Sequence, residues 1–150
     1  MAADVRSPLL GDLLAQARHW WIREMSVRLS ARGYLGYRRT DASALRFLRR
    51  DELTIGRLGA ALGVTRQAAR HVVDGLEARG YARATRDPLD TRCVRIVLTA
   101  AGRTYADAVV DVVHALNREV ADQLDSALVD ATRAVLQSIV EMPSSSSSDV

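Results

Sequence analysis

The sequence predicts a mainly α-helical protein with one small β-hairpin, and two observations lead to this prediction. Apolar residues recur at helical spacing over most of the 150 residues, and glycines or prolines separate the periodic segments. Residues 81–98 have instead the composition of two short strands joined by a turn. The length suits a single domain with helical extensions.

The first two helices are predicted from this periodicity. One runs from Pro8 to about Leu29 behind Ser7 as the N-cap, and the next begins behind Thr40 or Asp41. Within the apolar arc of the first helix, two polar residues lie four positions apart. Either the arc turns to solvent there, or the two form a half-buried pair at a dimer interface or ligand cavity; they are Glu24 and Arg28.

A helix-turn-helix follows. Thr54 is the predicted cap of a short helix that ends at Leu62, and Gly63 supplies the left-handed turn. Thr65 opens the next helix, which continues to Arg79. Two helices joined by a tight glycine turn are typical of this motif.

The β-hairpin comes directly after that motif. Its strands are predicted at 81–85 and 93–98, with a turn at 86–92. By alternation, Val94, Ile96 and Leu98 face one side, and Cys93 lies on the other. A helix-turn-helix followed by a basic hairpin indicates a winged helix.

Two further helices complete the chain. Thr99 caps a helix from Ala100 to about Leu124, and Asp125 or Ser126 caps a last helix that Pro143 ends. Serines at 144–148 predict a disordered tail. A partner chain is expected to bury the apolar positions of both helices, which are Tyr105, Val109, Val112, Leu116, Val120, Leu128, Val135 and Ile139.

Charge divides the chain into a basic and an acidic part. Arginine provides all 21 basic residues: ten against six acids in residues 1–56, nine against four in 57–103, and two against eight in 104–150. A basic front and middle permits a polyanionic partner. No apolar run in the sequence is long enough to span a membrane, so no membrane partner is expected. The sequence contains a single cysteine, which suits a protein of the reducing cytoplasm. Since no metal motif, phosphate loop or catalytic triad is found, neither an enzyme nor a cofactor is expected.

The winged-helix segment resembles the MarR family of transcriptional regulators. The resemblance lies in LGVTRQAARHVVDGLEARG at 62–80, RDPLDTR at 86–92, and VRIVLTAAGR at 94–103. It implies an obligate homodimer that binds pseudo-palindromic double-stranded DNA and responds to a small, often aromatic, ligand. It also implies that the wing arginine Arg92, clamped by Asp90, reaches the minor groove.

The residues themselves predict a DNA-binding surface. On a helical wheel, one side of the fourth helix is apolar and the other carries groups that pair with bases, such as arginine with guanine and glutamine with adenine. The N-terminus of the helix favours phosphate. With the arginines of the wing, the predicted DNA-binding set is Thr65, Arg66, Gln67, Arg70, His71, Arg86, Asp90 and Arg92. Asp74, at the edge of this set, is expected to orient an arginine, and Gly75 to allow close approach of another segment.

A ligand site is predicted near the first helix. Aromatic rings with a cation suit an aromatic carboxylate or phenol, although such rings are also common core residues. The candidates are Trp20, Trp21, Tyr34, Tyr37 and Arg38. Cys93 beside arginines could in principle sense oxidants, but the peroxide sensors of the family use an N-terminal cysteine that this chain lacks.

These observations predict a mainly α fold with a β-hairpin wing, flanked by long dimerisation helices. Residues 1–39 form the N-terminal dimerisation helix and loop, 40–99 the DNA-binding domain, 100–142 the C-terminal dimerisation helices, and 143–150 the tail. The expected function is that of a homodimeric repressor released from its operator by a small aromatic or phenolic effector. The alternatives are a ligand-independent architectural DNA-binding protein and a winged-helix protein–protein adapter.

Overall fold

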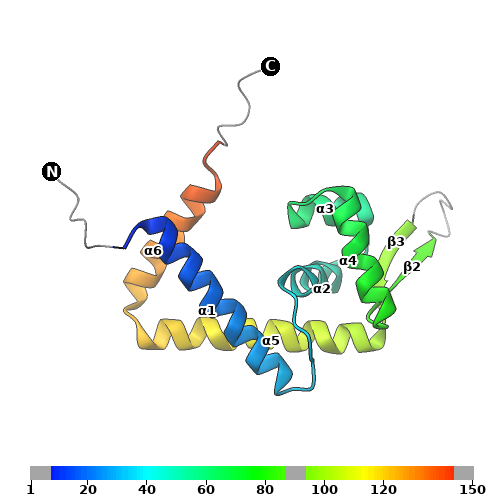
Figure 1. Ribbon diagram of the computed structural model, residues 1–150, viewed down its shortest axis with the longest axis horizontal. Helices are drawn as coiled ribbons and strands as arrows, with labels where there is room; N and C mark the ends of the chain where they lie inside the picture. The colour runs from blue at the N-terminus through cyan, green and yellow to red at the C-terminus, as the bar shows by residue number, and fades with distance from the viewer. Residues whose placement is uncertain (1–7, 87–93, 144–150) are drawn as a thin grey trace. The chain divides into compact units, whose positions relative to one another are not determined.

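The computed structural model describes residues 8–86 and 94–143 and confirms the mainly helical fold with a small sheet (Figure 1). The chain forms two compact units, Met1–Val112 and Val113–Val150. In chain order the elements are α1 (Leu10–Ser30), α2 (Arg39–Arg50), β1 (Leu53–Thr54), α3 (Ile55–Leu62), α4 (Arg66–Ala78), β2 (Ala82–Arg86), β3 (Val94–Leu98), α5 (Ala100–Gln123) and α6 (Ser126–Val140).

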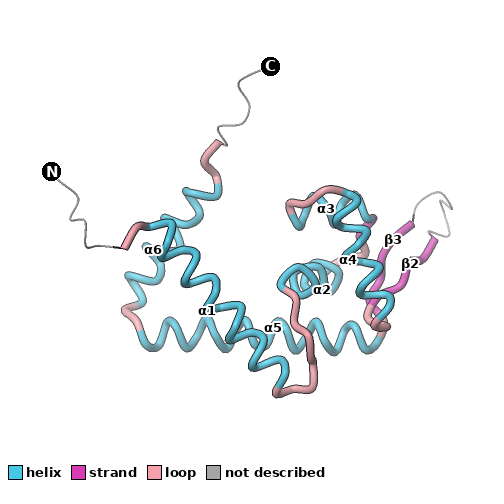
Figure 2. Tube along the Cα trace, viewed as in Figure 1, coloured by secondary structure: helices cyan, strands magenta, loops and turns pink. Residues whose placement is uncertain are grey.

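The core of the first unit joins the helix-turn-helix to the sheet. Four side chains from α2, α3, α4 and β3 are fully buried, namely Leu45, Leu58, Leu76 and Ile96. Each lies on the apolar side of an amphipathic element, and together they remove that side from water. This packing fixes α4 and the two hairpin strands on one body (Figure 2).

The sheet has one strand more than the sequence predicted. Its antiparallel order is β1-β3-β2, and β1 pairs with β3 through Leu53↔Ile96 and Thr54↔Arg95. β1 has only two residues, too few to show an alternating pattern. At the end of β3 both faces are buried, because Val97 is covered like its neighbours Ile96 and Leu98.

Helix capping agrees with the sequence at four helices and differs at two. Thr54, Thr65 and Asp125 accept hydrogen bonds from backbone amides of α3, α4 and α6, and Thr99 Oγ1 accepts one from Gly102 in α5. By contrast, α1 and α2 begin behind Leu9 and Arg38, which provide no side-chain cap. Ser7 lies outside the described residues. Asp41, a predicted cap, lies inside α2 and is buried.

Burial on α5 corrects one expectation. Its side chains Tyr105, Val109, Val112 and Leu116 are at most 3% exposed within this single chain. They therefore need no partner chain to leave water, contrary to the prediction. Val120 is half-buried.

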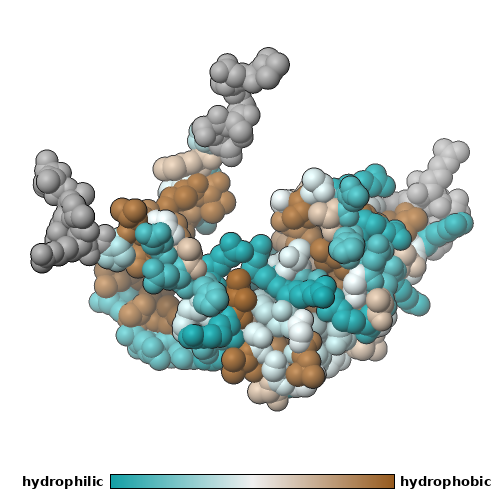
Figure 3. Space-filling model, in the orientation of Figure 1, coloured by the Kyte–Doolittle hydropathy of each residue, from teal (hydrophilic) through white to brown (hydrophobic). Residues whose placement is uncertain are grey.

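The apolar side chains of α6, in contrast, are largely exposed. Leu128 is 67% exposed, Val135 53% and Val140 84%, whereas Ile139 is intermediate. Brown, apolar atoms are visible over this helix in Figure 3. Within the second unit, α6 and the end of α5 enclose a hollow of about 310 Å³ lined by Val120, Leu124, Leu128, Val129, Thr132, Arg133 and Leu136. None of the described helices is long and apolar enough to cross a membrane.

Candidate nucleic-acid interface

The turn before α4 is tight and fixed by backbone contacts. Gly63 has φ +67°, in the left-handed region that glycine adopts without steric cost. The amide of Val64 donates to the carbonyl of Gly59 at 3.0 Å, and Thr65 Oγ1 accepts from the amide of Ala68 at 3.2 Å. These bonds set where α4 starts.

The two sides of α4 have opposite exposure, as predicted. Ala69, Val73 and Leu76 are fully buried. The opposite side is exposed, and a shallow depression of about 610 Å³ lies along it. Its lining consists of Thr65, Gln67, Ala68, Arg70, His71 and Asp74.

Two arginines of this surface differ in their electrostatic surroundings. Arg66 is exposed at the first turn, and no carboxylate among the described residues lies within 4.0 Å of it. Arg70 is paired: its Nε lies 2.9 Å from Asp74 Oδ1, and both side chains are about half exposed. The predicted orientation of an arginine by Asp74 is therefore present in the structure.

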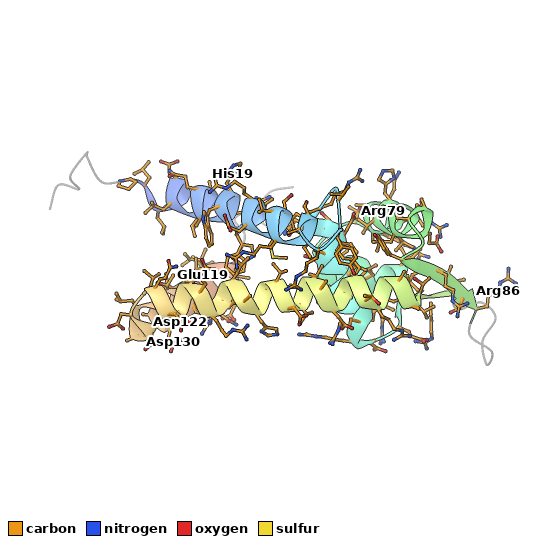
Figure 4. The ribbon with its side chains drawn as sticks, turned by 90° about the horizontal axis from the view of Figure 1, so that it is seen from below. His19, Arg79, Arg86, Glu119, Asp122 and Asp130 are labelled. Atoms are coloured by element: carbon orange, nitrogen blue, oxygen red, sulfur yellow. The ribbon has the colours of Figure 1, made fainter. Side chains whose placement is uncertain are left out.

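The wing contributes Arg86 from the described residues. Arg86 ends β2, is exposed, and is opposite Val94 in the hairpin register (Figure 4). Asp90, Arg92 and Cys93 lie outside the described residues.

A half-buried ion pair at the other end of α4 was not anticipated from the sequence. Arg79, labelled in Figure 4, places Nη2 2.6 Å from Asp41 Oδ2 of α2. Its Nε donates to the Gly75 carbonyl at 2.8 Å, and its guanidinium lies 5.9 Å from the centre of the Tyr81 ring. The only signal in the sequence is a lone acid at the start of α2, with nothing to identify an arginine 38 positions later as its partner. The neighbour of Gly75 is thus the Arg79 side chain rather than another segment.

The aromatic residues form different groups from the predicted one. Trp20 and Trp21 contact each other edge to face at 6.1 Å. Tyr34 instead stacks on Tyr105 at 4.3 Å, and Tyr81 lies 5.0 Å from that same ring.

Tyr37 lies close enough to Tyr105 to affect its pKa, so all four tyrosines of the chain gather in the first unit. Burial raises the pKa of Tyr37, and it raises that of Tyr105 to about 12, helped by Tyr81 and Asp41. Arg38 is exposed at the start of α2.

Of the two alternatives for Glu24 and Arg28 of α1, the structure agrees with a half-buried pair. Glu24 Oε2 lies 3.5 Å from Arg28 Nη2, and the side chains are 25% and 30% exposed. The pair is therefore shielded in part from solvent.

Comparison with known proteins supports the predicted family. Residues 28–92 match the sequence profile of the MarR family. Two curated mycobacterial relatives, Rv2011c of Mycobacterium tuberculosis and Mb2034c of Mycobacterium bovis, are each 32% identical over 88 residues. The match covers 59% of this chain and only 62% of either relative's length.

Solved structures share the fold over most of the chain. The repressor CouR, bound to a DNA duplex, has a TM-score of 0.76 at 23% identity and covers 89% of this chain and 93% of its own. BpsR of Bordetella bronchiseptica has a TM-score of 0.76 at 20% identity, and the match covers 95% of this chain and 100% of BpsR. The MarR-family protein RV2887 of M. tuberculosis, in complex with salicylic acid, has a TM-score of 0.64 at 26% identity, and the match covers 91% of this chain and 99% of RV2887.

The three-stranded sheet and the helix-turn-helix define a winged-helix protein of the class found in transcriptional regulators. The resemblance to the MarR family is confirmed, since the matched residues 28–92 contain α2, α3, α4 and β2. The MarR family is one of transcriptional regulators, and CouR is a transcriptional repressor.

Proposed function

We propose that this protein is a transcriptional regulator that binds double-stranded DNA with α4 in the major groove. The observation that carries the proposal is the exposed side of α4, on which Gln67, Arg70 and His71 lie together behind the capped N-terminus. Glutamine and arginine pair bidentately with adenine and guanine edges. Thr65 and Arg66, at the positive end of the helix, are suited to a phosphate.

In our proposal the wing extends this surface. Arg86 and Arg92 insert into the adjacent minor groove, where an A·T-rich sequence makes the electrostatic potential most negative. Asp90 is the residue that would hold Arg92 extended.

We propose a homodimer on a pseudo-palindromic operator, formed through residues 1–39 and 100–142, with 40–99 as the DNA-binding domain. The support is the exposed apolar surface of α6 and the hollow of about 310 Å³ beside it. A two-fold dimer would place two copies of α4 about one DNA turn apart, roughly 10 base pairs.

Regulation by an aromatic or phenolic effector is part of the same proposal. CouR is a repressor, RV2887 is seen with salicylic acid, and BpsR is regulated by 6-hydroxynicotinic acid. The candidate ligand residues fall into two groups: Trp20 and Trp21 on α1, and Tyr34, Tyr37 and Arg38 between α1 and α2. On this proposal the protein acts as a cytoplasmic repressor that the effector releases.

Substitutions on α4 are expected to change base preference, and a wing substitution to change affinity. We expect Gln67→Ala or Arg70→Ala to lose about 1–3 kcal/mol at particular base pairs of a duplex selected by the wild type from a randomised library. Arg92→Ala should weaken binding to every A·T-flanked duplex alike. Fluorescence anisotropy over a salt series measures both.

Arg118→Ala, which removes an exposed arginine of α5, is the matched control. If the α4 variants lose equal affinity for selected and random duplex, the base-reading role is wrong. If the wild type shows no salt-dependent DNA binding, the proposed function is wrong.

A charge on α6 is expected to weaken the dimer. Leu128→Glu introduces a carboxylate into the exposed apolar surface, and loss of one central contact of this kind costs about 2 kcal/mol or more of association free energy. Sedimentation equilibrium should show a dimer for the wild type at micromolar concentration and a shift towards monomer for the variant. Ala60→Glu, at an exposed position of α3 outside the proposed dimer segments, should leave the dimer unchanged; a stable wild-type monomer would contradict the proposal.

A further inference from the structure

The ion pair between Arg70 and Asp74 places a negative charge on the proposed DNA-binding surface. The first unit is rich in arginine, and most exposed positions on α4 that face the depression are neutral or basic. Asp74 is the one acid among the residues that line it. A carboxylate there opposes the approach of phosphates, so it lowers affinity for any DNA backbone.

Helix stability does not explain this acid. The pair has the arginine four residues before the aspartate, which is the less favourable order for an i,i+4 pair. Both side chains are half exposed, and exposed pairs of this kind contribute little to folding. Aspartate is also a poor residue for a helix interior.

The geometry of the pair suggests what it does. The carboxylate engages Arg70 through Nε, at 2.9 Å from Oδ1. An arginine held in this way keeps its two terminal nitrogens for a planar bidentate partner, which is the arrangement that recognises guanine O6 and N7.

We propose that Asp74 is a specificity-determining residue of this surface: it positions Arg70 for a guanine and discourages contacts of Arg70 with the phosphate backbone. The inference depends on the proposed function. Positioning lowers the conformational entropy that Arg70 loses on binding its base. The negative charge simultaneously penalises DNA that offers only phosphates.

Two substitutions separate the parts of this role. Asp74→Ala removes both the positioning contact and the charge, whereas Asp74→Asn removes the charge and keeps a polar side chain of the same size beside Arg70 Nε. We expect Asp74→Ala to bind random duplex several-fold more tightly, with a steeper salt dependence by about one phosphate equivalent. Its ratio of affinities for the selected over the random duplex should fall at least 10-fold, and the same ratio for Asp74→Asn should fall less.

The control is Asp51→Ala, directly after α2. It makes the same change in net charge at an exposed position outside the proposed dimer segments and the α4 surface. Its affinity ratio should equal that of the wild type. Circular dichroism melting checks that all variants are folded.

A second variant makes the test specific to Arg70. In an Arg70→Ala background, Asp74→Ala should still tighten binding to random duplex but should no longer change the preference at the guanine that Arg70 reads. If the wild type discriminates between duplexes and Asp74→Ala keeps the full affinity ratio, this inference is overturned and the proposed function stands. If the wild type binds neither duplex, the proposed function fails first.

Discussion

Gly102→Ala should strongly destabilise this protein, although it adds a single methyl group near the start of a helix. A Cβ at residue 102 would lie 1.8 Å from the carbonyl oxygen of Tyr81 and 2.7 Å from its carbonyl carbon. The obstruction is backbone, so no side-chain rotation can relieve it. Either the backbone at Tyr81, between α4 and β2, or the first turn of α5 would have to move.

That movement would break the hydrogen bonds that start α5. The amide of Thr99 donates to the Tyr81 carbonyl at 3.1 Å, and Thr99 Oγ1 donates to the Gly80 carbonyl at 2.6 Å. Overpacking costs about 1–3 kcal/mol and loss of a cap about 1 kcal/mol more. We therefore expect a fall of about 3 kcal/mol in unfolding free energy, measured by urea denaturation.

Two other glycines are suitable controls. A Cβ at Gly75 would lie 3.5 Å from Arg79 Nη2, an ordinary contact, and Gly11 on α1 has nothing within 4 Å. In both helices alanine is favoured over glycine by about 1 kcal/mol. Gly75→Ala and Gly11→Ala should therefore stabilise or leave stability unchanged; a Gly102→Ala variant as stable as the wild type would contradict the packing at Tyr81.

The parts of the fold that depend on local signals could be predicted from the sequence. Thr54, Gly63 and Thr65 each determine a helix end through a bond or a backbone angle within four residues. Such signals can be identified without any tertiary information. For the same reason, the division of α4 into a buried and an exposed side was predicted correctly.

Features that depend on distant contacts could not be predicted. The sequence predicts Asp41 as a helix cap, whereas in the structure Asp41 pairs with Arg79 at the end of α4. Tyr34 stacks on Tyr105 across 71 positions of sequence, whereas proximity in sequence suggested the tryptophans as its neighbours. Along α1, Trp21 is nine residues from Ser30, about 14 Å of helix, which separates it from the loop that carries Tyr34.

The candidate site shows the same limit. The sequence identified which residues of α4 are exposed, and it suggested that Asp74 orients an arginine. Only the structure shows that the partner is Arg70 and that the contact is made at Nε. This detail turns a general basic surface into a testable model of base recognition.

Alkaline pH should unfold this protein through its tyrosines, because the sequence contains no lysine. Arginine stays charged at pH 12, and the ordinary pKa values of a thiol and of an amino terminus lie below 9. Between pH 9 and pH 12 the four tyrosines are therefore the main side chains that change charge. All four belong to the group around Tyr105.

The expected result follows from the pKa of Tyr105. Burial, Tyr81 and Asp41 raise that pKa from the ordinary 10.0 to about 12 in the folded protein. Its contribution to stability is thus fully present below pH 10 and is lost as the pH rises towards 12, because the unfolded chain releases this proton first. Two pKa units correspond to about 2–3 kcal/mol of unfolding free energy.

The test compares urea denaturation of the wild type and Tyr105→Phe across this pH range. The phenylalanine keeps the ring that stacks on Tyr34 and Tyr81 but cannot ionise. The wild type should lose stability steeply above pH 10, and the variant should lose about 2 kcal/mol less between pH 10 and pH 12. Parallel curves for the two proteins would mean that Tyr105 ionises as readily in the folded as in the unfolded chain, which its 3% exposure does not allow.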